Sequence, residues 1–204
     1  MPNLSDTLLI IIVTTLISVL CFSNQKLLQS LIFSTLTIKK GQIYRFVSHG
    51  FVHANPGHLF MNMFTLYFFG RAIEHYYRLH LGSWGFIVFY LLAIVIAIIP
   101  SYIANRKNLH YASLGASGAV SAVLFAFVLM APWSKLYLFA ALPIPAIVFA
   151  IAYVAYTLYA QKQNRGKINH SAHLWGAAFG IIATLAINPH LGIRFIQMLL
   201  NPTF

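Results

Sequence analysis

Six long stretches of the chain contain no Lys, Arg, Asp or Glu, and their lengths give the first expectation for the fold. They cover residues 7–25, 46–70, 79–105, 108–134, 136–161 and 168–193. Each reaches the roughly 18 to 20 apolar residues that a helix needs to cross a bilayer. The stretches show no ten-residue alternation typical of a membrane barrel, and lipid offers the backbone no hydrogen-bond partner. The pattern therefore predicts helices.

We predict an all-α, polytopic membrane protein with six transmembrane helices in a single domain, residues 1–204. The approximate spans are 7–25, 56–78, 82–104, 114–133, 136–161 and 170–190. The first span has neither a basic flank before it nor a small-residue cleavage site after it, so we expect a retained helix rather than a secretory signal. In the long first loop, the apolar segment Leu27 to Ile38 has helical spacing and is expected to lie along the membrane interface.

Composition excludes a soluble enzyme and several kinds of site. Hydrophobic residues make up 60% of the chain and charged residues 7%, whereas soluble domains are about one quarter charged. Asp6 and Glu74 are the only acidic residues, which excludes an aspartate-pair protease and a carboxylate metal cage. The single Cys21 permits no internal disulfide.

The net charge of +11 points to membrane lipids rather than nucleic acid as partners. The basic residues are scattered between apolar runs, so anionic headgroups are the expected counterions and no nucleic-acid stripe forms. The loops after the first, third and fifth spans hold nine of them, against four on the other side, and the larger set is expected on the cytoplasmic side. The nine are Lys26, Lys39, Lys40, Arg45, Arg106, Lys107, Lys162, Arg165 and Lys167.

Polar residues cluster near the starts of the second, fourth and sixth spans. Polar groups at membrane depth are costly, so they mark function more often than in a soluble core. These three spans run in the same direction, because one antiparallel span separates each from the next. We therefore expect the three clusters to meet on one side of the membrane at shallow depth. They are His58 with Asn62, the run from Gly115 to Gly118 around Ser117, and His173 with Gly176 and Gly180.

The residue types in these clusters suit acyl transfer. Ser117 needs a base to remove its proton, and neutral His173 has a suitable pKa. His58, Asn62 and the backbone N–H of Ser117 are candidate donors to an oxyanion. Small residues allow the close helix contact that such a dyad needs, and the candidates for this supporting role are Gly115, Gly118, Gly176 and Gly180.

These motifs resemble those of the rhomboid intramembrane serine proteases, in the compact six-helix form found in bacteria. In that family a GxSG motif carries the nucleophile, here Ser117, and a histidine followed by glycines supplies the base, here His173. His58 and Asn62 match the residues that help form the oxyanion hole. A further match is the set Arg45, His49, His53, Gly70, Arg71 and Glu74.

The resemblance implies a fold, an activity and a location. It implies a six-helix rhomboid-like bundle that hydrolyses a peptide bond in or beside the transmembrane segment of a protein substrate, through an acyl-enzyme on Ser117. No metal or other cofactor is implied. The implied location is the bacterial cytoplasmic membrane, with the active site opening outward. That orientation is opposite to the one that the basic residues predict.

Two features of the chain differ from the family pattern or need a separate explanation. Many bacterial members carry an aromatic residue one turn after the nucleophile, stacked on the catalytic histidine, and this chain has Ser121 there. Nothing in the sequence indicates what replaces that ring. Pro143 and Pro145 lie within the fifth span and predict that its first half is kinked. A kinked helix could move locally, so one hypothesis is that the fifth helix gates substrate access.

Alternative interpretations remain open at this point. A non-catalytic rhomboid-like protein that binds transmembrane segments is the second hypothesis, and a histidine-lined metal transporter is a third. Ser117 could serve only helix packing, and His58 with Asn62 could serve only an interhelical hydrogen bond. For His49 and His53 we favour structural hydrogen bonds over a metal pair, and we expect His170 to be a solvated loop residue.

Overall fold

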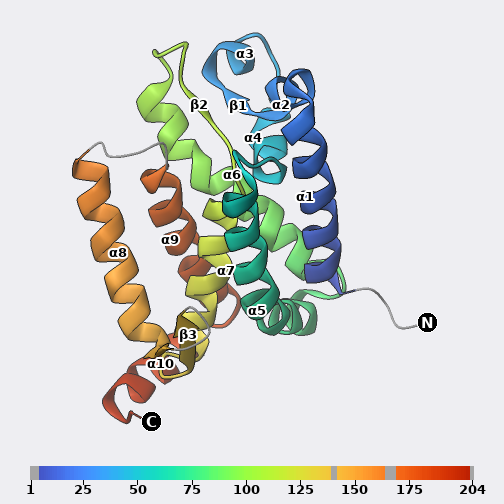
Figure 1. Ribbon diagram of the computed structural model, residues 1–204. Coiled ribbons are helices and arrows are strands. Elements are labelled where there is room, and N and C mark those ends of the chain that lie inside the picture. The colour runs from blue at the N-terminus through green and yellow to red at the C-terminus, as the bar shows by residue number, and fades with distance from the viewer. Residues whose placement is uncertain (1–4, 139–141, 164–168, 203–204) are drawn as a thin grey trace.

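The computed structural model describes residues 5–138, 142–163 and 169–202, and its helices follow the predicted spans (Figure 1). The long helices are α1 (Asp6–Ser23), α5 (Pro56–Leu81), α6 (Gly85–Asn105), α7 (Ser117–Met130), α8 (Ala146–Lys162) and α9 (His170–Ile187). Length and hydropathy alone qualify α1, α6 and α9 as membrane spans, while α7 and α8 are shorter apolar helices. The predicted helical membrane fold is confirmed. Arg165 and Lys167, two of the basic loop residues, lie outside the described residues.

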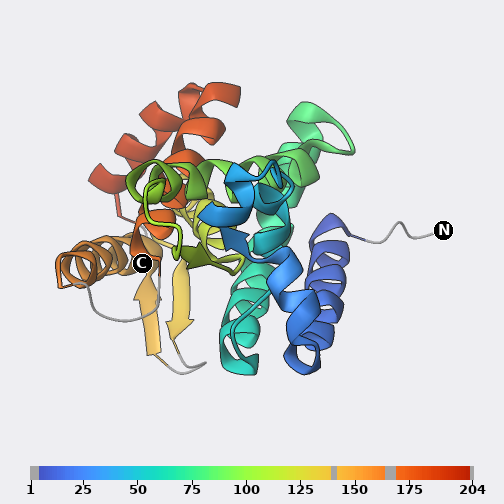
Figure 2. The same cartoon turned by 90° about the horizontal axis from the view of Figure 1, so that it is seen from above.

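Helix α7 lies in the interior, with α1 and α8 on opposite sides of the molecule (Figures 1 and 2). Eleven of its 14 residues are buried, because its side chains are small or apolar on every face. At 1.5 Å per residue it is about 21 Å long, shorter than the roughly 30 Å hydrocarbon core. The chain reaches Ser117 through a non-helical segment that contains the short strand β2 (Ala112–Ser113). Ser117 therefore stands where this inner helix begins.

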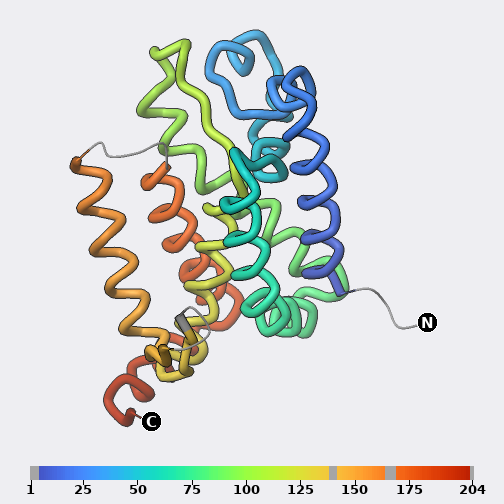
Figure 3. Tube along the Cα trace, viewed as in Figure 1, coloured from blue at the N-terminus to red at the C-terminus, as the bar shows by residue number. Residues whose placement is uncertain are grey.

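The long first loop folds into short elements above the bundle (Figure 3). These are α2 (Gln25–Leu31), β1 (Phe33–Ser34), α3 (Thr35–Lys39), α4 (Arg45–Ser48) and the 3-10 helix η1 (His49–Phe51). The apolar segment Leu27 to Ile38 is helical in α2, as the spacing of its first residues predicts, and is interrupted at β1, which pairs antiparallel with β2. The buried Arg45 guanidinium donates to the backbone oxygens of Gln29 and Ile32. The Arg45 contacts hold two parts of the loop together, and the pairing of β1 with β2 attaches the loop to the segment that leads into α7.

The prediction of one kinked helix over 136–161 is wrong in its first half. Strands β3 (Lys135–Leu138) and β4 (Leu142–Pro145) form an antiparallel hairpin there, and α8 begins only at Ala146. Pro143 and Pro145 belong to β4, because a proline lacks the N–H that a helix interior requires. Pro143 is paired with Tyr137 within the hairpin and Pro145 ends it, so neither proline bends α8. Residues 139–141 of the predicted span lie outside the described residues.

A further helix, α10 (His190–Leu200), follows α9 and was not predicted. Asn188 ends α9, and Pro189 precedes the new helix, as expected for a residue pair that disfavours helix continuation. Helix α10 leaves Ile193, Ile196 and Leu200 exposed. The spacing of these three residues places an apolar stripe along one helix face.

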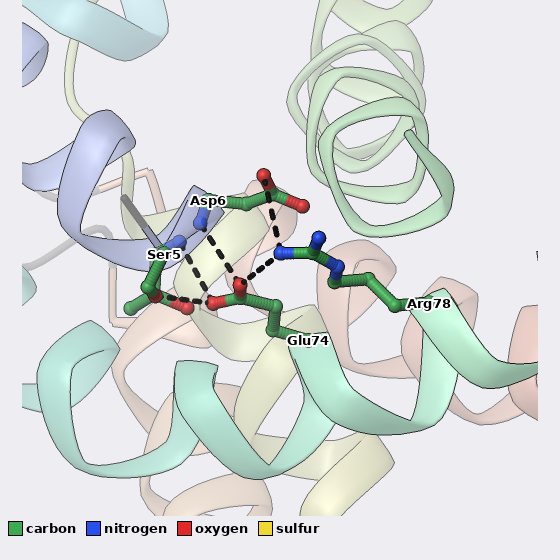
Figure 4. A network of polar contacts seen from close by, with 5 residues as sticks. Ser5, Asp6, Glu74 and Arg78 are labelled. Atoms are coloured by element: carbon green, nitrogen blue, oxygen red, sulfur yellow. Dashed lines mark hydrogen bonds and ion pairs between the residues drawn. The ribbon is translucent and has the colours of Figure 1, made fainter. Parts of the chain in front are cut away.

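The start of α1 is held by Glu74 of α5 (Figure 4). The buried carboxylate accepts hydrogen bonds from the Ser5 hydroxyl at 2.5 Å and from the backbone N–H groups of Asp6 and Thr7 at 2.9 and 3.0 Å. Arg78 lies 3.2 Å from the same carboxylate and 4.0 Å from Asp6. The first amides of a helix have no partner within the helix, so Glu74 supplies one from a neighbouring helix.

We expect Glu74→Gln to lower the free energy of unfolding by about 1–3 kcal/mol, because an amide keeps only one acceptor for three donors. Thermal unfolding in detergent measures the loss. The matched control is Arg78→Gln, which removes a partly exposed ion pair but leaves the three hydrogen bonds, and its expected cost is below about 1 kcal/mol. Equal losses in the two variants would show that the ion pair, and not the helix cap, stabilises this end of α1.

Candidate active site

Ser117 and His173 are in direct hydrogen-bond contact. His173 Nε2 lies 2.7 Å from Ser117 Oγ, although the two residues are 56 positions apart. Ser117 is the first residue of α7, and His173 lies in the first turn of α9. When Nε2 accepts the serine proton, the ring must carry its own proton on Nδ1. This is the geometry of a nucleophile next to its general base.

Glycines let α7 and α9 approach closely enough for this contact. A Cβ at Gly176 would lie 2.0 Å from the backbone oxygen of Gly118, and one at Gly180 would lie 2.1 Å from that of Ala122. A Cβ at Gly118 would lie 2.7 Å from the Ala97 Cβ of α6. Helices α7 and α9 therefore touch through their backbones at two places, one helical turn apart.

Gly115 differs from the other glycines of the predicted set because it lies outside the helices. Its φ of +114° is a conformation that side chains disfavour. A Cβ there would lie 2.6 Å from His58 Cε1. Gly115 thus turns the chain into α7 next to the His58 ring, which is a different role from helix packing.

Two histidines of the first loop hold the chain just before Ser117. The Gly115 N–H donates to the backbone oxygen of His49 at 2.9 Å, and the Ala116 N–H donates to His53 Nε2 at 3.4 Å. The amide of Ser117 itself stands at the start of α7, where intrahelical partners are lacking. It is a candidate backbone donor to a substrate oxygen.

The hydrogen bonds of His53 define its tautomer. Ser18 donates its hydroxyl proton to the Phe51 oxygen, so His53 Nδ1 donates to Ser18 Oγ at 3.0 Å and Nε2 is free to accept from Ala116. Burial, helped by the neighbouring His58, lowers the pKa of His53 to about 3. His53 therefore remains neutral at physiological pH and links α1 to the start of α7.

His49 is likewise buried and hydrogen-bonded. Its Nδ1 lies 3.0 Å from the Arg45 oxygen, and burial lowers its pKa to about 4. Both histidines of the predicted pair thus have structural hydrogen bonds. In the described part of the chain, no group of three or more His, Cys, Asp or Glu residues could hold a metal ion.

His58 and Asn62 lie at the start of α5 beside the dyad. They line a cavity of about 1190 Å³ together with Ser117 and His173. Asn55 caps this helix by accepting from the His58 N–H at 2.8 Å. The Asn62 side-chain amide donates one proton to the His58 backbone oxygen at 2.9 Å, which leaves its second N–H for another acceptor.

A tyrosine of α8 stands at the dyad, and sequence reasoning missed it. The Tyr153 ring stacks on the His173 ring with centroids 6.0 Å apart and an angle of 21°. The Tyr153 hydroxyl lies 2.6 Å from Ser121 Oγ. A tyrosine in the middle of an apolar run was the available signal, but only the packing of α8 beside α9 shows which residue it meets.

The prediction that His170 is a solvated loop residue is wrong. It is the first residue of α9 and is buried, with its ring centroid 6.2 Å from that of His173 and 6.3 Å from that of Tyr156. The helix begins three residues before His173, so His170 and His173 share a helix face.

A family model described as the Rhomboid domain matches residues 40–189. The chain is 32% identical over 173 residues to RHOMBOID-like protein 12, mitochondrial, of Arabidopsis thaliana, covering 79% of this chain and 52% of that protein. It is 32% identical over 148 residues to Rhomboid-like protein 11, chloroplastic, of the same plant, covering 68% and 50%.

A human relative is also similar. Presenilin-associated rhomboid-like protein, mitochondrial, of Homo sapiens is 33% identical over 138 residues, covering 64% of this chain and 34% of that protein. The chain thus spans about half the length of the two plant relatives and about a third of the human one.

Proposed function

The chain belongs to the rhomboid family, and from this premise we propose that it is an intramembrane serine endopeptidase that cleaves transmembrane protein substrates. The observation that carries the proposal is the 2.7 Å contact between His173 Nε2 and Ser117 Oγ. A serine in a membrane helix commonly serves only packing. A serine that shares its proton with a neutral imidazole in a large cavity has the groups needed for acyl transfer.

The proposed reaction follows the usual order of a serine hydrolase. Ser117 Oγ attacks the scissile carbonyl carbon while His173 Nε2 takes its proton, and the same proton then passes to the leaving amine as the peptide C–N bond breaks. His173 Nε2 next takes a proton from water while the water oxygen attacks the acyl carbon. The ester C–O bond to Ser117 Oγ then breaks, the new carboxyl end leaves, and the proton returns from His173 Nε2 to Ser117 Oγ. The backbone N–H of Ser117 and the side chains of His58 and Asn62 are the proposed donors to the oxyanion.

The shape of the cavity supports an apolar, extended or helical substrate segment. Phe64, Phe68 and Phe149 line it along with the dyad, and Phe60, Phe64 and Phe68 form a row of exposed rings on α5. Such a surface suits a transmembrane segment better than a soluble peptide. Membrane lipids are the other expected partners of this multi-pass membrane protein.

The cellular location is part of the proposal. The matched relatives are named as mitochondrial or chloroplastic, whereas the resemblance in the motifs implies the bacterial cytoplasmic membrane. We propose the bacterial membrane, with the dyad opening to the outer side. Fractionation of the native cells tests the location, and protease access to a tag in the first loop tests the orientation.

The experiment that tests the activity uses purified protein in liposomes with a single-pass substrate and a chelator throughout. We expect cleavage of the substrate and, separately, a covalent fluorophosphonate adduct on Ser117 in a peptide map. Binding of the substrate without cleavage or adduct would support the non-catalytic alternative. Cleavage that is absent in the chelator and appears only when metal is added in excess of it would contradict the serine mechanism.

A further inference from the structure

The aromatic partner of His173 is contributed by a different helix from the one that carries the nucleophile. Ser121, one turn after Ser117, is too small to cover the imidazole. Tyr153 of α8 provides the ring instead, stacked at 6.0 Å between centroids and 21° between planes. Offset stacking at this distance is a favoured arrangement of aromatic rings.

The hydroxyl group of the same tyrosine reaches the backbone of the nucleophile through Ser121. Ser121 Oγ donates to the Ser117 backbone oxygen at 2.8 Å. A serine hydroxyl has one proton, so at the 2.6 Å contact the Tyr153 hydroxyl must be the donor to Ser121 Oγ. Tyr153 therefore contacts the base directly and the nucleophile's backbone through one intermediate.

Helix α8 lies at the edge of the bundle (Figures 1 and 2). Its buried residues are Ala146, Ala150, Thr157 and Ala160, and the two first alanines belong to an apolar cluster with residues of α7 and Ala177 of α9. Other residues of the helix, among them Ile151 and Tyr159, are exposed. Tyr153 is a long side chain extending from this peripheral helix to the dyad.

We propose that Tyr153 is a positioning residue for His173. The geometry of the dyad then depends on how α8 packs against α7 and α9. The ring limits rotation of the imidazole, and rotation would break the contact to Ser117. Displacement of α8 would remove the ring and the Ser121 hydrogen bond together. The inference rests on the proposed protease function and deepens it.

The test compares Tyr153→Leu, which removes the ring, with Tyr153→Phe, which keeps it. Two readouts are measured in liposomes: the rate of Ser117 labelling by a fluorophosphonate probe, and kcat and KM for a single-pass substrate. We expect Tyr153→Leu to lower the labelling rate and kcat about tenfold or more, with KM changed less than about twofold. Tyr153→Phe should stay within about threefold of the wild type, because the stacking is retained.

The matched control is Tyr159→Leu, which removes an exposed tyrosine from the same helix and should leave both readouts unchanged. Thermal unfolding in detergent shows whether each variant folds. If Tyr153→Leu does not fold, Tyr153→Met replaces it, with the same expected loss of labelling rate and kcat. Wild-type labelling in the leucine variant, an equal loss in the phenylalanine variant, or a rise in KM alone would overturn the inference. A wild type that neither labels nor cleaves would overturn the proposed function and this inference with it.

The dependence on α8 is tested by a double-mutant cycle. Ala150→Phe places a large ring in the buried face of α8, and Ile151→Phe, on the exposed face, is its control. We expect Ala150→Phe to slow Ser117 labelling in the wild-type background but to slow it no further in the Tyr153→Leu background, since both changes remove the same contact. Additive losses would show that the seating of α8 acts by another route and would overturn the coupling.

Discussion

Replacing Ser117 or His173 by alanine is expected to lower the kcat for substrate cleavage by about a thousandfold or more. Ser117→Ala removes the oxygen that attacks the carbonyl carbon, and His173→Ala leaves the serine without a proton acceptor. The two atoms share one hydrogen bond at 2.7 Å, so they act as a unit. The double variant should therefore be no less active than either single variant. Cleavage of a single-pass substrate in liposomes measures all three.

Two controls keep this prediction specific. Ser23→Ala and His110→Ala remove an exposed serine and an exposed histidine outside the cavity, and both should cleave at the wild-type rate. All variants should unfold at similar temperatures, because neither dyad side chain forms part of the apolar clusters. Wild-type cleavage by Ser117→Ala would show that another group is the nucleophile.

The second large effect is expected on stability, from Gly176→Ala. The added Cβ would lie 2.0 Å from the backbone oxygen of Gly118, and a backbone atom cannot rotate away as a flexible side chain can. Helices α7 and α9 must then separate. Overpacked protein cores lose about 3 kcal/mol in the free energy of unfolding, and we expect a loss of that size here. Thermal unfolding in detergent, or steric trapping in bicelles, measures the loss.

The control for this prediction is Gly192→Ala in α10. A Cβ there would lie 3.4 Å from Leu185 Cδ2, an ordinary contact, and alanine favours a helix over glycine. Gly192→Ala should therefore be neutral or slightly stabilising. Equal stability of the two variants would mean that the α7 and α9 backbones can separate at little cost. The close approach would then not explain the glycines at 176 and 180.

Much of the fold could be predicted because its main determinants are local in the sequence. A stretch of some 20 apolar positions without charged residues is typical of a membrane helix, and successive spans must alternate in direction. This alternation alone predicts that the residues around His58, Ser117 and His173 lie on one side of the membrane. The structure brings these residues to a common cavity.

The errors arose where hydrophobicity does not distinguish one backbone conformation from another. The absence of charges in residues 136–161 is compatible with a helix and with a hairpin. Pro143 and Pro145 are the sequence signal against a helix before α8. The sequence predicts a solvated loop residue at His170, but α9 begins at that residue and buries it. The sequence predicts that Gly115 supports helix packing, but its φ of +114° shows that it forms a turn before α7.

The class of protein, the approximate positions of most long helices and the polar residues proposed for acyl transfer all follow from the sequence. They do so because bilayer energetics act on each segment separately and because few polar residues are available. How those residues meet follows from the packing of the helices: the 2.7 Å contact of the dyad, the hydrogen bond from Ala116 to His53, and the Tyr153 ring on His173. Such contacts depend on how helices distant in the sequence pack against one another, and no local pattern records that packing.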